Sequence, residues 1–261
     1  MGQQILTVEH LQVCYTGKPV LEDVSLTLES GQILGIVGES GSGKSTLIKA
    51  AMGLLGSNGA VTGGAIQYKD KNVTELKGEE LRKLRGPEMG IIFQNTSSSL
   101  CPIRTVEDQL YEAVLQHKRI SKQEIKEMAM DHFEKMKLLN GERILKSFPF
   151  ELSGGMNQRV GIMMAMILQP ALLFGDEPTS ALDVTVQAQV VREMMKLREL
   201  FGTPIAIVTH NIGMVEYMAD KVAVMYHGRI VEYGDAKQVI QHPQELYTRE
   251  LIRSVLRIHR G

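Results

Sequence analysis

Along the first part of the chain, hydrophobic and polar positions alternate with a period of two, which is the pattern of a β-strand with one buried face. The alternation covers residues 6–13 and 24–28, and the turn-forming residues 16–19 stand between them. A third segment of this kind, residues 65–68, follows two glycines. These segments predict a small antiparallel β layer whose other face is in water.

Four short runs are apolar throughout and rich in β-branched or aromatic residues: residues 33–37, 90–93, 172–174 and 205–208. Strands of a parallel sheet are buried on both faces and have this composition. The runs therefore predict buried parallel strands at the centre of an α/β fold.

The middle third of the chain has a helical period of apolar and charged positions. Helices are predicted over residues 106–116, 122–137 and 156–168, so this part is interpreted as a helical insertion. Its many methionines suit either a binding surface for a soft metal or the filling of a core, and core filling is the favoured interpretation.

The composition is typical of a soluble, intracellular globular protein. The 261 residues, 43% of them hydrophobic, can fill one large core or two joined ones, and the formal net charge of -1 gives no footprint for nucleic acid. No apolar stretch reaches the roughly 18 residues of a membrane span. Residues 1–4 lack the features of a secretory leader. Cys14 and Cys101 stand far apart, which disfavours a disulfide framework or a metal site.

Residues 38–46 read Gly-Glu-Ser-Gly-Ser-Gly-Lys-Ser-Thr, a complete G-x-x-x-x-G-K-[ST] loop between the strand-like residues 32–37 and the helix-like residues 46–55. A flexible Gly/Ser linker is the alternative, but it does not explain the lysine or the flanking elements. The glycines can aim backbone N–H groups at an anion, while Lys44 would reach the β- and γ-phosphates and Ser45 would ligate Mg²⁺. The predicted nucleotide-binding residues of the loop are Gly38, Ser40, Gly41, Gly43, Lys44, Ser45 and Thr46.

A pair of acids, Asp176 and Glu177, ends another apolar run. Asp176 is predicted to serve Mg²⁺, and Glu177 to polarise a water that attacks the γ-phosphate. Adjacent acids are common after strands, but after a phosphate loop they indicate hydrolysis of a nucleoside triphosphate.

Further motifs stand around this pair: Ser153-Gly154-Gly155 opens an apolar helix, Asp183 follows the acids, and Gln94 and His210 each follow an apolar run. With these motifs in this order, the chain resembles the ATP-binding subunits of ABC transporters over essentially its whole length. Ser153 is predicted to be the N-cap of its helix, which makes that helix start a second anion site.

The resemblance implies roles for these residues. Tyr15 would stack on adenine, and Gln94 would contact Mg²⁺ and the attacking water while relaying the state of the site to membrane subunits. His210 would hold both the γ-phosphate and Glu177, and Asp183 is one of the nucleotide-binding motifs. Ser153, Gly154 and Gly155 would act on the ATP of a second subunit, because subunits of the family pair head to tail.

The implied fold class is α/β: a P-loop NTPase (RecA-like) core with a small antiparallel β subdomain and an inserted α-helical subdomain. We expect the ATP-binding core with its β layer over residues 1–93 and 168–240. The helical signature subdomain is expected over residues 94–167, and a C-terminal extension over residues 241–261.

Within the family, the chain is similar to the peptide and nickel importer branch at two places. One is Met156, in the signature motif that begins with Ser153-Gly154-Gly155, and the other is the tail His242–Arg249. Asn95, Thr96 and Cys101 depart from the usual coupling segment of that branch. The chain has no C-terminal cysteine cluster before Gly261, so we expect a shorter subunit of the nickel or dipeptide type.

The resulting prediction is a subunit that binds and hydrolyses ATP with Mg²⁺ and energises import of di- or oligopeptides, or of nickel. Its expected partners are a second ATP-binding subunit, two transmembrane permease subunits and, through these, an extracytoplasmic solute-binding protein, with no nucleic acid. It is expected at the cytoplasmic face of the membrane as a peripheral subunit. The alternatives are a soluble ABC-type ATPase acting on ribosomes or DNA, and a nucleotide-sensing module without turnover.

Overall fold

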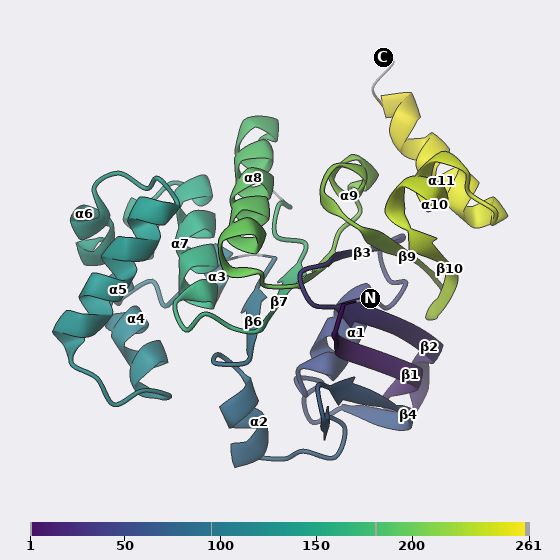
Figure 1. Cartoon of the computed structure of the whole chain (residues 1–261), viewed down its shortest axis with the longest axis horizontal. Coiled ribbons are helices and arrows are strands. Elements are labelled where there is room, and N and C mark those ends of the chain that lie inside the picture. The colour runs from purple at the N-terminus through teal and green to yellow at the C-terminus, as the bar shows by residue number, and fades with distance from the viewer. Residues whose placement is uncertain (1, 95, 181, 259–261) are drawn as a thin grey trace. The chain divides into compact units, whose positions relative to one another are not determined.

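The structure, a computed structural model of the chain, describes residues 2–94, 96–180 and 182–258. Asn95 and the last residues of the predicted C-terminal extension lie outside this description. The chain forms two compact units, of which the first comprises Met1–Arg82 with Gly202–Gly261 and the second Lys83–Phe201. Figure 1 gives the labels of the helices and strands. The boundaries expected near residues 93 and 168 stay a prediction.

An antiparallel sheet in the first unit confirms the predicted β layer. Its strands occur in the order β2-β1-β4-β5, namely β2 (Lys18–Glu29), β1 (Gln4–Tyr15), β4 (Gly59–Tyr68) and β5 (Lys71–Asn72). Val24, Leu26 and Leu28 are buried on one face of β2, whereas Ser25 between them is exposed. The alternation of the sequence therefore follows the two faces of the strand.

The other strands of the first unit are centred on β3 (Ile33–Val37), which is buried along its whole length. It pairs in parallel with β8 (Ile205–Val208) on one side and with β9 (Lys221–Tyr226) on the other, and β10 (Arg229–Asp235) runs antiparallel to β9. The predicted buried parallel strands 33–37 and 205–208 are confirmed, and β9 and β10 are additional to those expected. The helices of this unit are α1 (Lys44–Ala51), α9 (Ile212–Met218), α10 (Ala236–Gln241) and α11 (Leu246–Ile258).

Helix α1 ends earlier than the sequence suggests, because the expectation of helix to residue 55 is wrong beyond Ala51. Gly53 has a φ of 63°, its N–H donates to the carbonyl of Ala50 at 3.0 Å, and the N–H of Leu54 donates to that of Lys49 at 2.6 Å. This pair of hydrogen bonds is a Schellman motif, which closes a helix at a glycine.

The second unit contains the parallel strands β6 (Met89–Ile92) and β7 (Leu172–Asp176) and a group of helices. The helices are α3 (Thr96–Ser99), α4 (Val106–Leu115), α5 (Lys122–Lys135), α6 (Gly141–Lys146), the 3₁₀ turn η1 (Pro149–Glu151), α7 (Gly154–Met166) and α8 (Val184–Phe201). A short helix, α2 (Glu79–Leu84), crosses the boundary between the units.

The three predicted helices of this second unit are present as α4, α5 and α7. Met136, Met163 and Met166 are buried, which confirms the core-filling interpretation at these three positions. Among the described residues, no helix has the length and apolar character needed to cross a membrane.

The strand that leads to the phosphate loop lies directly against helix α9. A Cβ atom on Gly35, in β3, would lie 2.5 Å from Cγ1 of Val215 in α9, and Val215 is completely buried. Real Cβ atoms do not approach so closely, so a glycine at this position lets α9 pack on β3.

We expect Gly35→Ala to lower the free energy of unfolding by about 1–3 kcal/mol, because the added methyl group overpacks this contact. In a Val215→Ala background the same change should cost much less, since the clashing methyl groups are gone. Urea titrations of the two single variants and the double variant measure this coupling.

The control is Gly213→Ala in α9, where the nearest atom to an added Cβ is 3.4 Å away. It should be neutral or slightly stabilising, because alanine is the better helix former. Additive effects of Gly35→Ala and Val215→Ala would contradict the packing argument.

Candidate functional site

The loop at residues 38–43 follows β3 and is built on glycines that have no substitute. Gly38 has a φ of 153°, and a Cβ on it would lie 2.2 Å from the carbonyl oxygen of Met225 in β9. Gly43 has a φ of 101°, and its Cβ would lie 2.5 Å from Cδ2 of Leu21 in β2. The loop therefore lies closer to its neighbours than any other residue type permits.

Lys44 is the first residue of α1, and only 4% of it is exposed. Its ammonium donates hydrogen bonds to the carbonyl oxygens of Gly38 at 2.9 Å and Glu39 at 2.7 Å, so the charge is held over the loop. The N-cap of α1 is Gly43, which has no side chain to accept from the N–H groups of the first turn. An anion in the loop can take that place and meets the positive end of the helix there.

His210 follows strand β8, and the register of the sheet places it beside the start of the loop. Ile36 pairs with Val208, and the N–H of Thr209 donates to the carbonyl of Ile36 at 3.1 Å. Because β3 and β8 are parallel, the residues that follow them, Gly38 and His210, lie at the same edge of the sheet. His210 is exposed at this edge.

Tyr15, the predicted adenine-stacking residue, is the last residue of β1 and is half-buried. It pairs with Gly59 of β4, and a Cβ on that glycine would lie 2.7 Å from Cε1 of Tyr15. The ring of Tyr15 therefore lies close to this glycine, in space that a side chain at position 59 would occupy.

The second unit contains the carboxylates, and it brings Glu177 and Gln94 together. Asp176 is the last residue of β7, and Gln94 follows the neighbouring parallel strand β6. Nε2 of Gln94 donates to Oε2 of Glu177 at 3.2 Å. Glu177 also has a φ of 47°, a left-handed backbone conformation that costs free energy in a residue with a Cβ.

Gln158, in α7, links two segments of this site and is not among the residues singled out from the sequence. Oγ1 of Thr96 donates to its Oε1 at 2.7 Å, and its Nε2 donates to the carbonyl of Pro178 at 2.6 Å. Thr96 follows Gln94 and Pro178 follows Glu177, so one buried amide joins both neighbouring segments to α7. The only signal in the sequence is a polar residue within an apolar helix.

The signature motif has the predicted helix start. Ser153 is the N-cap of α7 and accepts a hydrogen bond from the N–H of Met156 at 3.2 Å, which confirms the expected cap. A Cβ on Gly154 would have no atom within 4 Å, so the backbone of this turn is open on that side. A Cβ on Gly155 would lie 2.8 Å from Val186 of α8.

Asp183 lies at the start of α8, where its Oδ1 accepts from the N–H of Val186 at 2.9 Å. Val186 is the residue that also packs against Gly155. The signature turn and the aspartate are therefore adjacent within the second unit.

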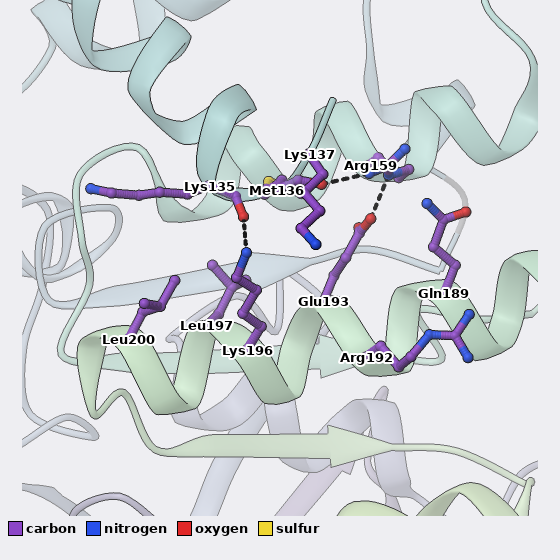
Figure 2. A pocket seen from close by; sticks show the side chains of 10 residues that line it. All are labelled: Lys135, Met136, Lys137, Arg159, Gln189, Arg192, Glu193, Lys196, Leu197 and Leu200. Carbon is purple, nitrogen blue, oxygen red and sulfur yellow. Dashed lines mark hydrogen bonds and ion pairs between the residues drawn. The ribbon is translucent and has the colours of Figure 1, made fainter. Parts of the chain in front are cut away.

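Helix α7 is tied to α8 by an ion pair between Arg159 and Glu193 (Figure 2). Nε of Arg159 lies 2.5 Å from Oε1 of Glu193, and the two side chains are 11% and 8% exposed. Burial raises the pKa of the Glu193 carboxyl, and the charge of Arg159 opposes this shift. Arg159 also donates to the carbonyl of Met136 at 2.7 Å, so it holds the end of α5 as well.

A cavity of about 370 Å³ adjoins this pair, lined by side chains from the end of α5, from α7 and from α8. Lys137, Arg192 and Lys196 are among its lining residues. Figure 2 shows the ion pair crossing from one helix to the other at the wall of this cavity.

The structure thus groups the predicted site residues by unit. The loop residues, Tyr15 and His210 belong to the first unit, and the second unit contains Gln94, Ser153, Gly154, Gly155, Asp176, Glu177 and Asp183. Their individual roles in binding and hydrolysis stay predictions.

Comparisons with known proteins agree with this pattern of motifs. The family model described as "ABC transporter" matches residues 21–180. The chain is 43% identical to the oligopeptide transport ATP-binding protein OppD of Salmonella typhimurium, covering 91% of this chain and 71% of that protein. It is 40% identical to the dipeptide transport ATP-binding protein DppD of Bacillus subtilis, covering 98% and 78% respectively.

Among solved structures, the fold is similar to that of CbiO1 from Clostridium perfringens, described as part of the ABC transporter complex CbiONQ. The TM-score is 0.79 at 27% sequence identity, and the match covers 99% of this chain and 97% of that one. The predicted α/β fold class of a P-loop ATPase is confirmed.

The backbone of Glu177 gives a stability prediction that is independent of its chemistry. We expect Glu177→Gly to be more stable than Glu177→Ala by about 1 kcal/mol, because only glycine adopts the left-handed conformation without strain. Denaturant titrations of the two variants measure the difference.

The control site is Glu199, an exposed residue of helix α8. There the order should reverse, with Glu199→Gly less stable than Glu199→Ala by about 1 kcal/mol. An alanine variant at position 177 that equals or exceeds the glycine variant would show that the residue is not strained.

Replacing Arg159 by methionine should lower the free energy of unfolding by about 3–5 kcal/mol at neutral pH, since Glu193 is left buried without its partner. The pKa of Glu193, already raised by burial, should rise further when the arginine charge is lost. Between its unfolded pKa, about 4.3, and this higher folded value, the native state holds a proton that the unfolded state has lost. Stability contributed by this group therefore falls as the pH rises through that window.

The deficit of Arg159→Met against the parent chain should therefore be smallest near pH 4 and grow toward pH 7, as measured by urea titration at several pH values. Adding Glu193→Leu should restore much of the stability, because an apolar pair can replace a buried ion pair. If the stability deficit of Arg159→Met did not change with pH, the buried carboxylate of Glu193 would not be its cause.

Proposed function

The chain belongs to the ABC transporter family, and we propose that it energises import of di- or oligopeptides as the ATP-hydrolysing subunit of a transporter. The observation that supports peptides as the cargo is the similarity over most of the chain to OppD and DppD, which are named for oligopeptide and dipeptide transport. Nickel remains the alternative cargo of the same branch.

ATP is the proposed ligand of the loop at residues 38–46. The buried ammonium of Lys44 and the uncapped first turn of α1 suit the β- and γ-phosphates, and Ser45 follows in the same turn. Tyr15, half-buried at the end of β1, offers an aromatic ring for adenine. We propose that the loop residues bind the phosphates of ATP and that the glycines allow these phosphates to approach the backbone closely.

Mg²⁺ is proposed as the metal, with Ser45, Gln94 and Asp176 as its residues. Hydroxyl, amide and carboxylate oxygens are the donors that this hard cation prefers. When bound, Mg²⁺ neutralises charge on the β- and γ-phosphate oxygens.

Glu177 is the proposed general base for the attacking water. The hydrogen bond from the Gln94 amide orients its carboxylate. We propose that His210, exposed at the edge of the sheet after β8, holds the γ-phosphate. The protein would then promote hydrolysis by positioning the reacting groups, without forming a covalent bond to the phosphate itself.

A second ATP-binding subunit is the proposed partner, in a head-to-tail pair that is a heterodimer. The open backbone at Gly154 and the helix start capped by Ser153 offer an anion site to the partner's ATP, with Asp183 beside it. Because each ATP would contact both subunits only when they close, binding would shift the population toward the closed pair.

We propose that two permease subunits read this closure, with a solute-binding protein outside the membrane delivering the cargo. The chain would then lie at the cytoplasmic face as a peripheral subunit. We propose the same domain organisation that the sequence predicts. The ATP-binding core comprises residues 1–93 and 168–240, the helical signature subdomain residues 94–167 and the C-terminal extension residues 241–261.

Glu177→Gln should lower ATP hydrolysis by roughly 10²-fold or more, because an amide cannot accept the proton from water. ATP binding should be preserved. Phosphate release and ATP affinity are measured on the chain assembled with its partner subunit and permease in lipid vesicles, with uptake of a labelled dipeptide or of Ni²⁺ as the transport readout.

Glu199→Gln, at an exposed position on α8, is the matched control and should hydrolyse ATP at the parent rate. Unchanged turnover in Glu177→Gln would refute the catalytic assignment. Uptake of Ni²⁺ without uptake of dipeptide would refute the proposed cargo and favour the alternative.

A further inference from the structure

The phosphate loop has one contact from a distant part of the chain, the C-terminal helix α11. The backbone N–H of Glu39 donates a hydrogen bond to the hydroxyl oxygen of Tyr247 at 3.0 Å, across 208 positions of sequence. Tyr247 is the second residue of α11, and both residues belong to the first unit.

This hydrogen bond is made by the same peptide unit that accepts a hydrogen bond from Lys44. The N–H of Glu39 and the carbonyl of Gly38 are the two ends of one planar amide. The carbonyl end accepts from the Lys44 ammonium at 2.9 Å, and the N–H end donates to Tyr247 at 3.0 Å. Turning this amide about its axis would break both hydrogen bonds together, and each bond polarises the amide in favour of the other.

Helix α11 is fixed at its start by strand β10. The carboxylate of Glu232 accepts from the N–H groups of Gln244 at 2.8 Å and Glu245 at 3.2 Å. Arg249 closes the same turn by donating to the carbonyl of Pro243 at 3.0 Å. Figure 1 shows α11, in yellow, next to α10 and β10.

The side chains of α11 also pack on the strand that leads to the loop. Tyr247 and Leu251 contact a buried cluster that includes Val37, the residue directly before Gly38. The Tyr247 ring lies 4.1 Å from that of Tyr226, between centroids. Burial raises the pKa of the Tyr247 hydroxyl, so the group is a neutral phenol at physiological pH.

We propose that Tyr247 is a positioning residue for Lys44, acting through the Gly38–Glu39 amide. It holds the carbonyl that receives the lysine ammonium and so preorganises the charge for a phosphate. The C-terminal segment thereby contributes to nucleotide affinity without touching the nucleotide. This inference rests on the proposed function of the loop as an ATP site.

The test is Tyr247→Phe, which keeps the ring and its packing and removes only the hydroxyl. ATP affinity, measured by titration with Mg²⁺ and ATP in a Glu177→Gln background, should fall by roughly two- to tenfold, the range that one hydrogen bond spans. In a Lys44→Met background the same change should have no further effect, because the group that it positions is absent.

The matched control is Tyr233→Phe, which removes a hydroxyl that donates to the carbonyl of Thr27 at 2.8 Å in the same unit. It should leave ATP affinity unchanged, and its melting temperature serves as the reference for the loss of one tyrosine hydroxyl. Equal affinity in Tyr247→Phe and the parent chain would overturn the proposal, as would an equal loss in the presence and absence of Lys44. A parent chain that does not bind ATP would instead refute the proposed function itself.

Discussion

The structure depends on the close approach of one backbone loop to its neighbours at the end of β3. A Cβ on Gly38 would lie 2.2 Å from the carbonyl oxygen of Met225, and a Cβ on Gly43 would lie 2.5 Å from Cδ2 of Leu21. The lack of side chains lets the loop lie directly against β9 and β2. Helix α1 begins immediately after the loop at Lys44, whose ammonium donates to two carbonyl groups of the loop. The position of the proposed phosphate site is therefore set by the strands around the loop.

In the second unit, buried polar side chains add to the close packing of glycines such as Gly155. The amide of Gln158 holds the segments after β6 and β7 to α7, and the Arg159–Glu193 pair holds α7 to α8. Both are buried polar contacts, which are costly unless every partner is in place. Helix α7 thus connects the segments after β6 and β7 with helix α8, and the signature turn is the start of the same helix.

Local patterns in the sequence predict much of this arrangement. Alternation and apolar runs are properties of a strand's own residues, so most of the strands were predictable, as were the phosphate loop and the cap of α7 by Ser153. Strands β9 and β10 were not predicted. The end of α1 was not, because a good helical pattern continues past Gly53 while the glycine closes the helix. Contacts such as Glu39 with Tyr247 could not be predicted, since they join residues whose proximity only the complete fold determines.

Glu177 shows how the two levels combine at the site. Its sequence context predicts a carboxylate at a strand end, but its backbone has a φ of 47°, against the preference of any residue other than glycine. Four of the five residues of β7 before it are buried, and the carbonyl of Pro178 after it is held by Gln158. Packing on both sides outweighs the local cost, and the strained residue is the one whose side chain receives the hydrogen bond from Gln94. A conformation that the chain would not choose locally is thus maintained at the residue that we propose as the general base, whose carboxylate accepts from the Gln94 amide.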